Sequence, residues 1–122
     1  MEKKYKYDLQ KRLVIFSAEI IKSVQALHKN YAAEHLTKQL IRSASSAALN
    51  YGEAQSAESR KDFIHKMKLS LKELRETQVN LEILNEADLI KDHQKFEFII
   101  KEIKELVAIF TTSIQTSKNK EI

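Results

Sequence analysis

Apolar residues recur at every third or fourth position in four separate segments of the chain. That spacing puts them on one face of an α-helix, so it predicts helices over about residues 8–26, 34–55, 60–87 and 92–116. Each helix then has one apolar stripe and an otherwise polar surface, as helices around a shared core do. The stripes comprise Leu9, Leu13, Phe16, Ile20, Val24 and Leu27; Leu36, Leu40, Ala44, Ala47, Tyr51 and Ala54; Phe63, Met67, Leu71, Leu74, Leu81 and Leu84; and Phe96, Ile99, Ile103, Val107, Phe110 and Ile114.

Residues that commonly cap helices stand at three of the predicted starts. Asp8 and Asp92 are expected N-caps, and Ser59 with Asp62 has the S-x-x-D form of a capping box. Residues 27–33 lose the periodicity and are expected to form a loop, whereas the two later connections are short. Short connections make consecutive helices antiparallel neighbours. The whole chain is therefore predicted to form one all-α domain, an antiparallel up-down-up-down four-helix bundle.

Composition agrees with long helices and few turns. The 122 residues include no proline and one glycine, the two residues that turns most often use. Gly52 falls within the second helix, where it indicates either close packing or a local bend. Residues 43–48 of that helix are all serine or alanine, so we expect a neighbouring helix to approach closely there.

Some apolar residues fall outside the four stripes. They are interpreted either as ordinary exposed apolar surface or as a surface for self-association or for a partner protein. They are Val14, Ile15, Ile21, Leu69, Val79, Ile83, Ile100 and Leu106.

Polar residues of the second and third helices are expected to pair across their interface. In an antiparallel pair that turns near residues 57–59, facing positions add up to about 117. This arrangement brings Arg42 within reach of Glu76 and Glu73, as well as Glu53 near Lys66 and Asn50 near Met67. We interpret Arg42, Asn50, Glu53, Glu73 and Glu76 as a structural polar network, because they follow an interface and do not converge on a pocket.

Several classes of function lack the residues they require. The chain has no cysteine, which excludes disulfides, thiol catalysis and thiolate-bound metal. Di-iron bundles need two Glu-x-x-His motifs, and this chain has only Asp62-x-x-His65. Phosphate-binding glycine motifs and a nucleophile elbow are also missing. We therefore expect no enzyme, no metal and no cofactor. With neither an apolar signal core nor a membrane span, a cytoplasmic protein is expected.

Charge is distributed unevenly along the chain, whose formal net charge is +4. In an up-down bundle the N-terminus, the second connection and the C-terminus share one end. That end is basic, because residues 60–75 alone hold six basic and two acidic side chains. The opposite end is acidic. A basic surface attracts phosphate backbones without reading bases. The candidate nucleic-acid contacts are Lys3, Lys4, Lys6, Lys11, Arg12, Arg60, Lys61, Lys66, Lys68 and Lys72.

The segment from Gln39 to Thr77 has a distinctive pattern of residues. It resembles the four-helix bundle proteins encoded in intervening sequences of bacterial 23S ribosomal RNA genes, and the likeness extends over about residues 8–112. One departure is His28-Lys29, where the family commonly has a proline, and Gly52 is another. The matching residues are Asp8-Leu9, Arg12-Leu13, Phe16, Gln39-Leu40, Arg42-Ser43, Asn50-Tyr51, Glu53-Ala54, Asp62-Phe63-Ile64-His65-Lys66, Lys72-Glu73 and Arg75-Glu76-Thr77.

This resemblance implies a bundle that assembles into a ring-like homopentamer. It also links the chain to the accessory proteins of diversity-generating retroelements, which form basic pentamers and bind nucleic acid and a reverse transcriptase. Two hypotheses follow. The first is a non-enzymatic homo-oligomer that binds RNA or DNA through its basic surface with little sequence specificity. The alternative is a structural scaffold that binds a protein partner.

Overall fold

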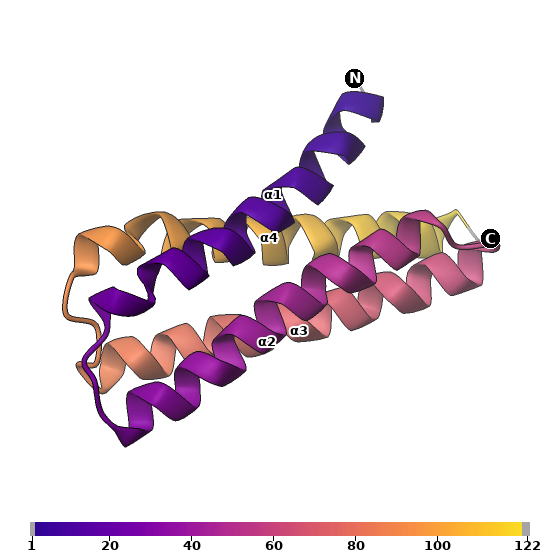
Figure 1. Ribbon diagram of the computed structural model, residues 1–122. Helices are drawn as coiled ribbons and strands as arrows, with labels where there is room; N and C mark the ends of the chain where they lie inside the picture. The colour runs from indigo at the N-terminus through magenta and orange to yellow at the C-terminus, as the bar shows by residue number, and fades with distance from the viewer. Residues whose placement is uncertain (1, 121–122) are drawn as a thin grey trace.

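Four long α-helices follow one another along the chain, as the hydrophobic spacing predicts. The computed structural model describes residues 2–120 and their side chains from Leu9 onward. The helices are α1 (Glu2–Ser23), α2 (Tyr31–Gln55), α3 (Arg60–Glu86) and α4 (His93–Asn119), and a short 3-10 helix, η1 (Val24–Ala26), follows α1. They pack in chain order as an up-down bundle, so the all-α fold class is confirmed (Figure 1).

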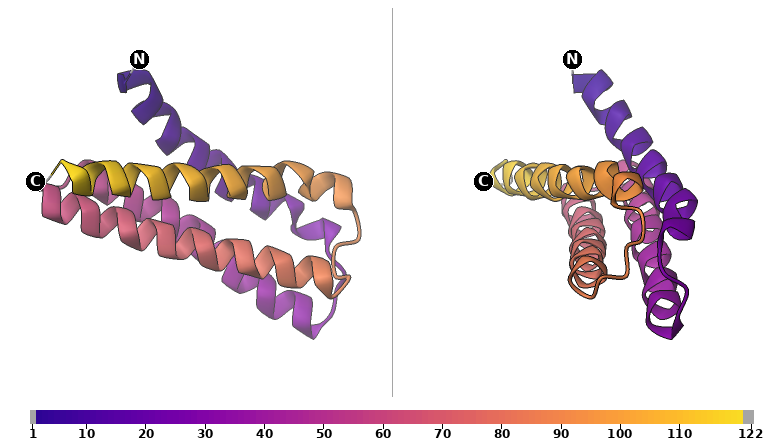
Figure 2. Two further views of the ribbon diagram at one scale, coloured as in Figure 1. Left: turned by 180° about the vertical axis from the view of Figure 1, so that it is seen from behind. Right: turned by 90° about the vertical axis from the view of Figure 1, so that its left-hand side faces the viewer.

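The helices do not all run equally close together. The turn between α2 and α3 lies beside the C-terminal end of α4, and the other two connections lie together at the far end (Figure 1). Seen from the end of the bundle, α1 and α3 are diagonal to each other, and each packs against α2 and α4 (Figure 2). Toward its N-terminus α1 diverges from the other three helices (Figure 1). The helices are therefore arranged less regularly than in an ideal four-helix bundle.

The first two helices begin earlier than expected. α1 starts at Glu2, so Asp8 lies inside it and is not the N-cap, because residues 2–7 include neither proline nor glycine to end a helix. α1 also ends at Ser23, before the predicted boundary near residue 26. α2 starts at Tyr31 because Asn30 caps it, accepting a hydrogen bond from the Ala33 backbone N–H at 2.8 Å.

The other two predicted caps are present. The Ser59 side chain accepts a hydrogen bond from the Asp62 backbone N–H at 3.0 Å, which starts α3. The Asp92 side chain accepts one from the Gln94 N–H at 3.2 Å, which starts α4. The periodicity predicts that α4 ends near residue 116, but the helix continues to Asn119.

The two connections at the far end of the bundle pair with each other through their backbones. The His28 N–H donates to the Leu89 carbonyl at 2.8 Å, and the Lys91 N–H donates to the Ala26 carbonyl at 2.6 Å. Between these bonds Leu27 and Ile90 form an isolated antiparallel bridge, and both side chains are buried. The connection between α1 and α2 is therefore shorter than the expected loop, and backbone hydrogen bonds fix it to the connection between α3 and α4.

The core consists mainly of the predicted stripes, with Phe16, Phe96 and Phe110 completely buried. Leu106 was expected outside the stripe of its helix, and this expectation is wrong because its side chain is fully buried. It lies three residues after Ile103 and four before Phe110, so it belongs to the same helical face.

The small residues of α2 behave as expected, and one of the two interpretations of Gly52 is wrong. Ser43, Ala44 and Ala47 are buried where α2 meets its neighbours. A Cβ atom at position 52 would lie 3.7 Å from Gln10 Oε1, which is ordinary van der Waals contact. The close-packing interpretation of Gly52 is therefore wrong.

Candidate nucleic-acid interface

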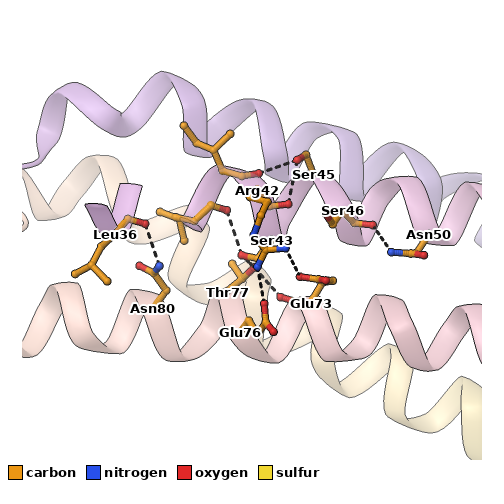
Figure 3. Close-up of polar contacts among 12 residues, drawn as sticks. Leu36, Arg42, Ser43, Ser45, Ser46, Asn50, Glu73, Glu76, Thr77 and Asn80 are labelled. Carbon is orange, nitrogen blue, oxygen red and sulfur yellow. Dashed lines mark hydrogen bonds and ion pairs between the residues drawn. The ribbon is translucent and has the colours of Figure 1, made fainter. Parts of the chain in front are cut away.

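Arg42 on α2 lies across from two carboxylates of α3. Its Nη2 donates to Glu76 Oε2 at 2.8 Å and its Nη1 donates to Glu73 Oε1 at 3.3 Å (Figure 3). Burial, together with the adjacent Glu76, raises the pKa of the Glu73 carboxyl. Hydrogen bonding to Arg42 lowers the pKa of the Glu76 carboxyl. The antiparallel register expected for these three residues is present, and it gives the two carboxylates unequal environments.

Glu53 and Asn50, the remaining members of the predicted polar network, behave differently from each other. Lys66 Nζ donates to Glu53 Oε1 at 2.6 Å, so this candidate cation is engaged within the fold. Asn50 does not reach across to α3 as expected. Its side-chain amide donates to the Ser46 carbonyl of its own helix at 2.9 Å, because that carbonyl lies one helical turn away (Figure 3).

Three buried polar contacts between α2 and α3 were not predicted. The hydroxyls of Ser43 and Thr77 are 2.6 Å apart, and Asn80 Nδ2 donates to the Leu36 carbonyl at 3.0 Å (Figure 3). Ser70 Oγ donates to the Ala47 carbonyl at 2.9 Å. Ser70 and Thr77 lie three residues after Met67 and Leu74, so small polar residues at apolar-stripe spacing were the available signal.

Arg12, another candidate cation, forms an ion pair between α1 and α4. Its Nε donates to Glu102 Oε2 at 2.9 Å and its Nη2 donates to Glu102 Oε1 at 2.6 Å. Glu105 lies 3.4 Å from the same Nη2. Glu102 is only 7% exposed, so its carboxylate depends on this partner. The contact with Glu102 raises the pKa of Arg12 and keeps its guanidinium in the bundle.

A cationic stripe runs along the exposed outer face of α3. It consists of Lys61, Lys68, Lys72 and Arg75, whose spacings of seven, four and three residues place them on one side of the helix. All four are exposed, and none forms a salt bridge with another described residue. The stripe is about 21 Å long at 1.5 Å per residue. Three of the candidate nucleic-acid contacts, Lys61, Lys68 and Lys72, therefore lie on this stripe, and Arg75 extends it.

Of the other candidate cations, Lys11 lies apart from this stripe (Figure 2). Lys11 is exposed on α1, which lies diagonally across the bundle from α3. Arg60 is exposed at the first position of α3. The side chains of Lys3, Lys4 and Lys6 lie outside the described residues.

A groove of about 790 Å³ adjoins the cationic stripe. Its lining combines apolar side chains with cations of the stripe, and it lies along α3 with α2 at its border. The apolar members are Leu36, Leu71, Val79 and Ile83, and the cations are Arg42, Lys68, Lys72 and Arg75.

Among the side chains that the structure describes, no group of three or more His, Cys, Asp or Glu is arranged to hold a metal ion. None of the helices has both the length and the apolar character that crossing a membrane requires.

This bundle is similar in sequence and structure to known proteins. A search of curated proteins finds no significant match. The structure is similar to the crystal structure of a protein with unknown function from the S23 ribosomal protein family of Bacteroides thetaiotaomicron. The TM-score is 0.76 at 29% sequence identity, and the match covers 87% of this chain and 97% of that one. The family profile described as 23S rRNA-intervening sequence protein matches residues 6–112. The chain therefore belongs to the 23S rRNA-intervening sequence protein family.

Proposed function

We propose that this protein is a non-enzymatic homo-oligomer that binds the RNA or DNA backbone through the cationic stripe of α3, with little sequence specificity. The observation that carries the proposal is that some cations of the protein are paired with carboxylates and others are not. Arg12, Arg42 and Lys66 are neutralised by carboxylates within the bundle. The four cations of the stripe are aligned and exposed, and none forms a salt bridge with a described residue. Lys72 is close enough to Glu76 for its charge to help lower the pKa of that carboxyl.

Helix stability does not account for this arrangement. Cations stabilise the C-terminal end of a helix and destabilise its N-terminal end. Lys61 stands in the first turn of α3, and the last turn of α3 has no basic residue. The position of Lys61 is therefore unfavourable for the helix itself, whereas Lys68, Lys72 and Arg75 lie beyond the first turn, where the dipole has little effect. The helix dipole does not favour the stripe, and this supports a role in binding an anion outside the chain.

The stripe suits contact with phosphates more than readout of bases. Lysine and arginine neutralise phosphates and release counterions, which makes the affinity fall steeply with salt. The four described helices do not form any of the DNA- or RNA-reading modules with defined base contacts, so sequence preference should be weak. Assembly into a homopentamer, which the family resemblance implies, would bring five such stripes into one particle.

The test measures binding of a fluorescent structured RNA by anisotropy at about 50 mM and about 200 mM salt. The variant Lys61→Ala/Lys68→Ala/Lys72→Ala removes three cations of the stripe. The matched control, Lys29→Ala/Lys38→Ala/Lys104→Ala, removes three exposed lysines elsewhere and changes net charge equally. We expect the stripe variant to bind more weakly and its plot of log affinity against log salt to be shallower by roughly two to three units.

Two results would contradict this proposal. One is the absence of any complex at micromolar protein and low salt. The other is an equal loss of affinity in the control variant, because net charge alone would then explain binding. Light scattering on a sizing column tests the oligomer separately, and a monomer would contradict that part.

A further inference from the structure

The groove along α3 contains apolar side chains that the rest of the described chain leaves uncovered. Val79 is 53% exposed and Ile83 is 45% exposed, one helical turn apart on the same face. Leu36 from α2 lies at the border and is half-buried. A groove of this volume with an apolar floor is typical of a binding site.

The charges around this floor are mainly positive. Lys68, Lys72 and Arg75 line the groove on the N-terminal side of Val79. Glu76 also lines it, but this carboxylate is neutralised by Arg42 at 2.8 Å. An occupant that matches both features must present apolar groups on one face and carboxylates beside them.

We propose that this groove binds an acidic amphipathic helix of a partner protein. From Lys68 to Ile83 the groove follows α3 for about 22 Å at 1.5 Å per residue, which is the length of about four turns of a second helix. Apolar side chains spaced by three, four and seven residues would cover Val79, Ile83 and Leu36. Acidic side chains flanking them would meet Lys68, Lys72 and Arg75.

The apolar floor favours a helix over a nucleic acid at this place. Phosphates would contact the cations but would leave Val79 and Ile83 in water. No aromatic side chain lines the groove, so it offers no ring on which a base could stack. The inference does not rest on nucleic-acid binding by the stripe. Because both ligands would use Lys68 and Lys72, they are expected to compete.

The experiment uses the full chain and three labelled peptides of about 16 residues, which is the length of the groove. The first is an amphipathic helix with leucines on one face and glutamates beside them. The second has the same composition in scrambled order, and the third has lysine in place of glutamate. By fluorescence anisotropy we expect the acidic amphipathic peptide to bind at least about tenfold more tightly than either of the others.

The variant Val79→Gln/Ile83→Gln makes the floor polar on an exposed helix face, where glutamine is well tolerated. Its matched control is Val14→Gln/Ile21→Gln, because those side chains are 53% and 55% exposed on α1, away from the groove. We expect the groove variant to bind the acidic peptide roughly tenfold more weakly. The control variant should bind the peptide normally, and both variants should bind the structured RNA normally.

Four outcomes of the binding measurements would overturn the inference. These are no binding of the acidic peptide, equal binding of its scrambled form, normal peptide binding by the groove variant, or an RNA affinity that falls with the peptide affinity in that variant. The last would assign the groove to nucleic acid. Light scattering on the groove variant addresses a second copy of the chain as occupant, because a smaller assembly than that of the wild type would also overturn the inference. Loss of RNA binding in the stripe variant alone bears only on the nucleic-acid proposal.

Discussion

The α2–α3 pair and α1 are held in the bundle by different kinds of contact. α2 and α3 meet through small side chains and through hydrogen bonds that cross between them, such as Ser43 to Thr77. α1 packs mainly through apolar side chains, with Arg12 and its carboxylate partners as its ion-pair contact to α4. Gln10 Oε1 and Ser17 Oγ on α1, like Asn80 Oδ1 on α3, are buried without a hydrogen-bond partner among the described residues.

This difference shows which part of the molecule is best suited to present a binding surface. Hydrogen bonds are directional, so they fix how far one helix is shifted along another, whereas apolar contacts tolerate sliding and tilting. The cationic stripe and the groove both lie on α3, within the pair that has the directional contacts. α1 has fewer such contacts and diverges from the bundle (Figure 1). We expect α1 to separate before α2 and α3 do.

The strongest test of this comparison removes a large apolar side chain from α1. Phe16 is fully buried, so Phe16→Ala should lower the free energy of unfolding by about 3–5 kcal/mol in urea titrations. Because apolar packing is the main attachment of α1, amide exchange should increase most in α1 and least in α2 and α3. Hydrogen exchange read by mass spectrometry measures the exchange of α1 and of the α2–α3 pair.

Phe110→Ala on α4 is the matched control for that variant. Phe110 is also fully buried and lies edge-on to Tyr51 of α2, with ring centroids 5.6 Å apart. Its loss should destabilise the chain by a similar amount but should increase exchange across the bundle. An equal pattern of exchange in the two variants would show that α1 is not a separately opening unit.

The second test compares the ion pair of α1 with that of α2. Arg12→Ala strands the buried Glu102 and should lower the free energy of unfolding by about 2 kcal/mol. The Arg42 side chain is 56% exposed, so solvent screening should limit the loss in Arg42→Ala to about 0.5 kcal/mol. A double-mutant cycle with Glu102→Gln measures the coupling. Equal losses in the two arginine variants would argue against a special role for Arg12.

How much of this could be read from the sequence differs between the two regions. The pairing of Arg42 with Glu76 was predictable because an antiparallel turn near residues 57–59 determines which residues face each other. The pairing of Arg12 with Glu102 joins residues 90 positions apart. It depends on how α1 leans on α4, and periodicity specifies which face of a helix is buried but not its neighbour or its tilt.

The candidate sites show the same limit. Val79 and Ile83 stood out as apolar residues outside the stripe, and Lys61, Lys68 and Lys72 stood out as cations. That Lys66 would be neutralised by Glu53, and that Leu36 of α2 would complete a groove with α3, required the three-dimensional arrangement. The residue types of both surfaces are visible in the sequence, but which cations are available and which are paired depends on the fold.

A smaller effect is expected from the buried hydroxyl pair of α2 and α3. Thr77→Val keeps the shape of the side chain but removes a hydroxyl 2.6 Å from Ser43 Oγ. We expect a loss of about 1 kcal/mol in the free energy of unfolding. Each single variant already loses the hydrogen bond between the two hydroxyls, so the double variant Ser43→Ala/Thr77→Val should lose less than the two single variants together. Additive losses in thermal or urea unfolding would contradict this coupling.

The smallest predicted effect concerns the two carboxylates beside Arg42, which should respond oppositely to neutralisation. Glu76 has a lowered pKa, so its stabilising contribution exists above the pKa of the unfolded chain and disappears as the pH falls through the lower folded-state value. Glu73 has a raised pKa, so its charged form opposes folding at neutral pH. Because these side chains are near the surface, both effects should be a few tenths of a kcal/mol.

At pH 7 we therefore expect Glu76→Gln to lower the free energy of unfolding slightly and Glu73→Gln to leave it unchanged or raise it. Below about pH 4.3, where an ordinary glutamate becomes protonated, the deficit of Glu76→Gln should shrink and then vanish. Urea titrations of the two variants at a series of pH values measure this. Equal losses from both substitutions at pH 7 would mean that Arg42 stabilises the two carboxylates alike. The alignment of α2 with α3 would then depend on the buried hydroxyls and small side chains and not on the exposed cluster of Arg42, Glu73 and Glu76.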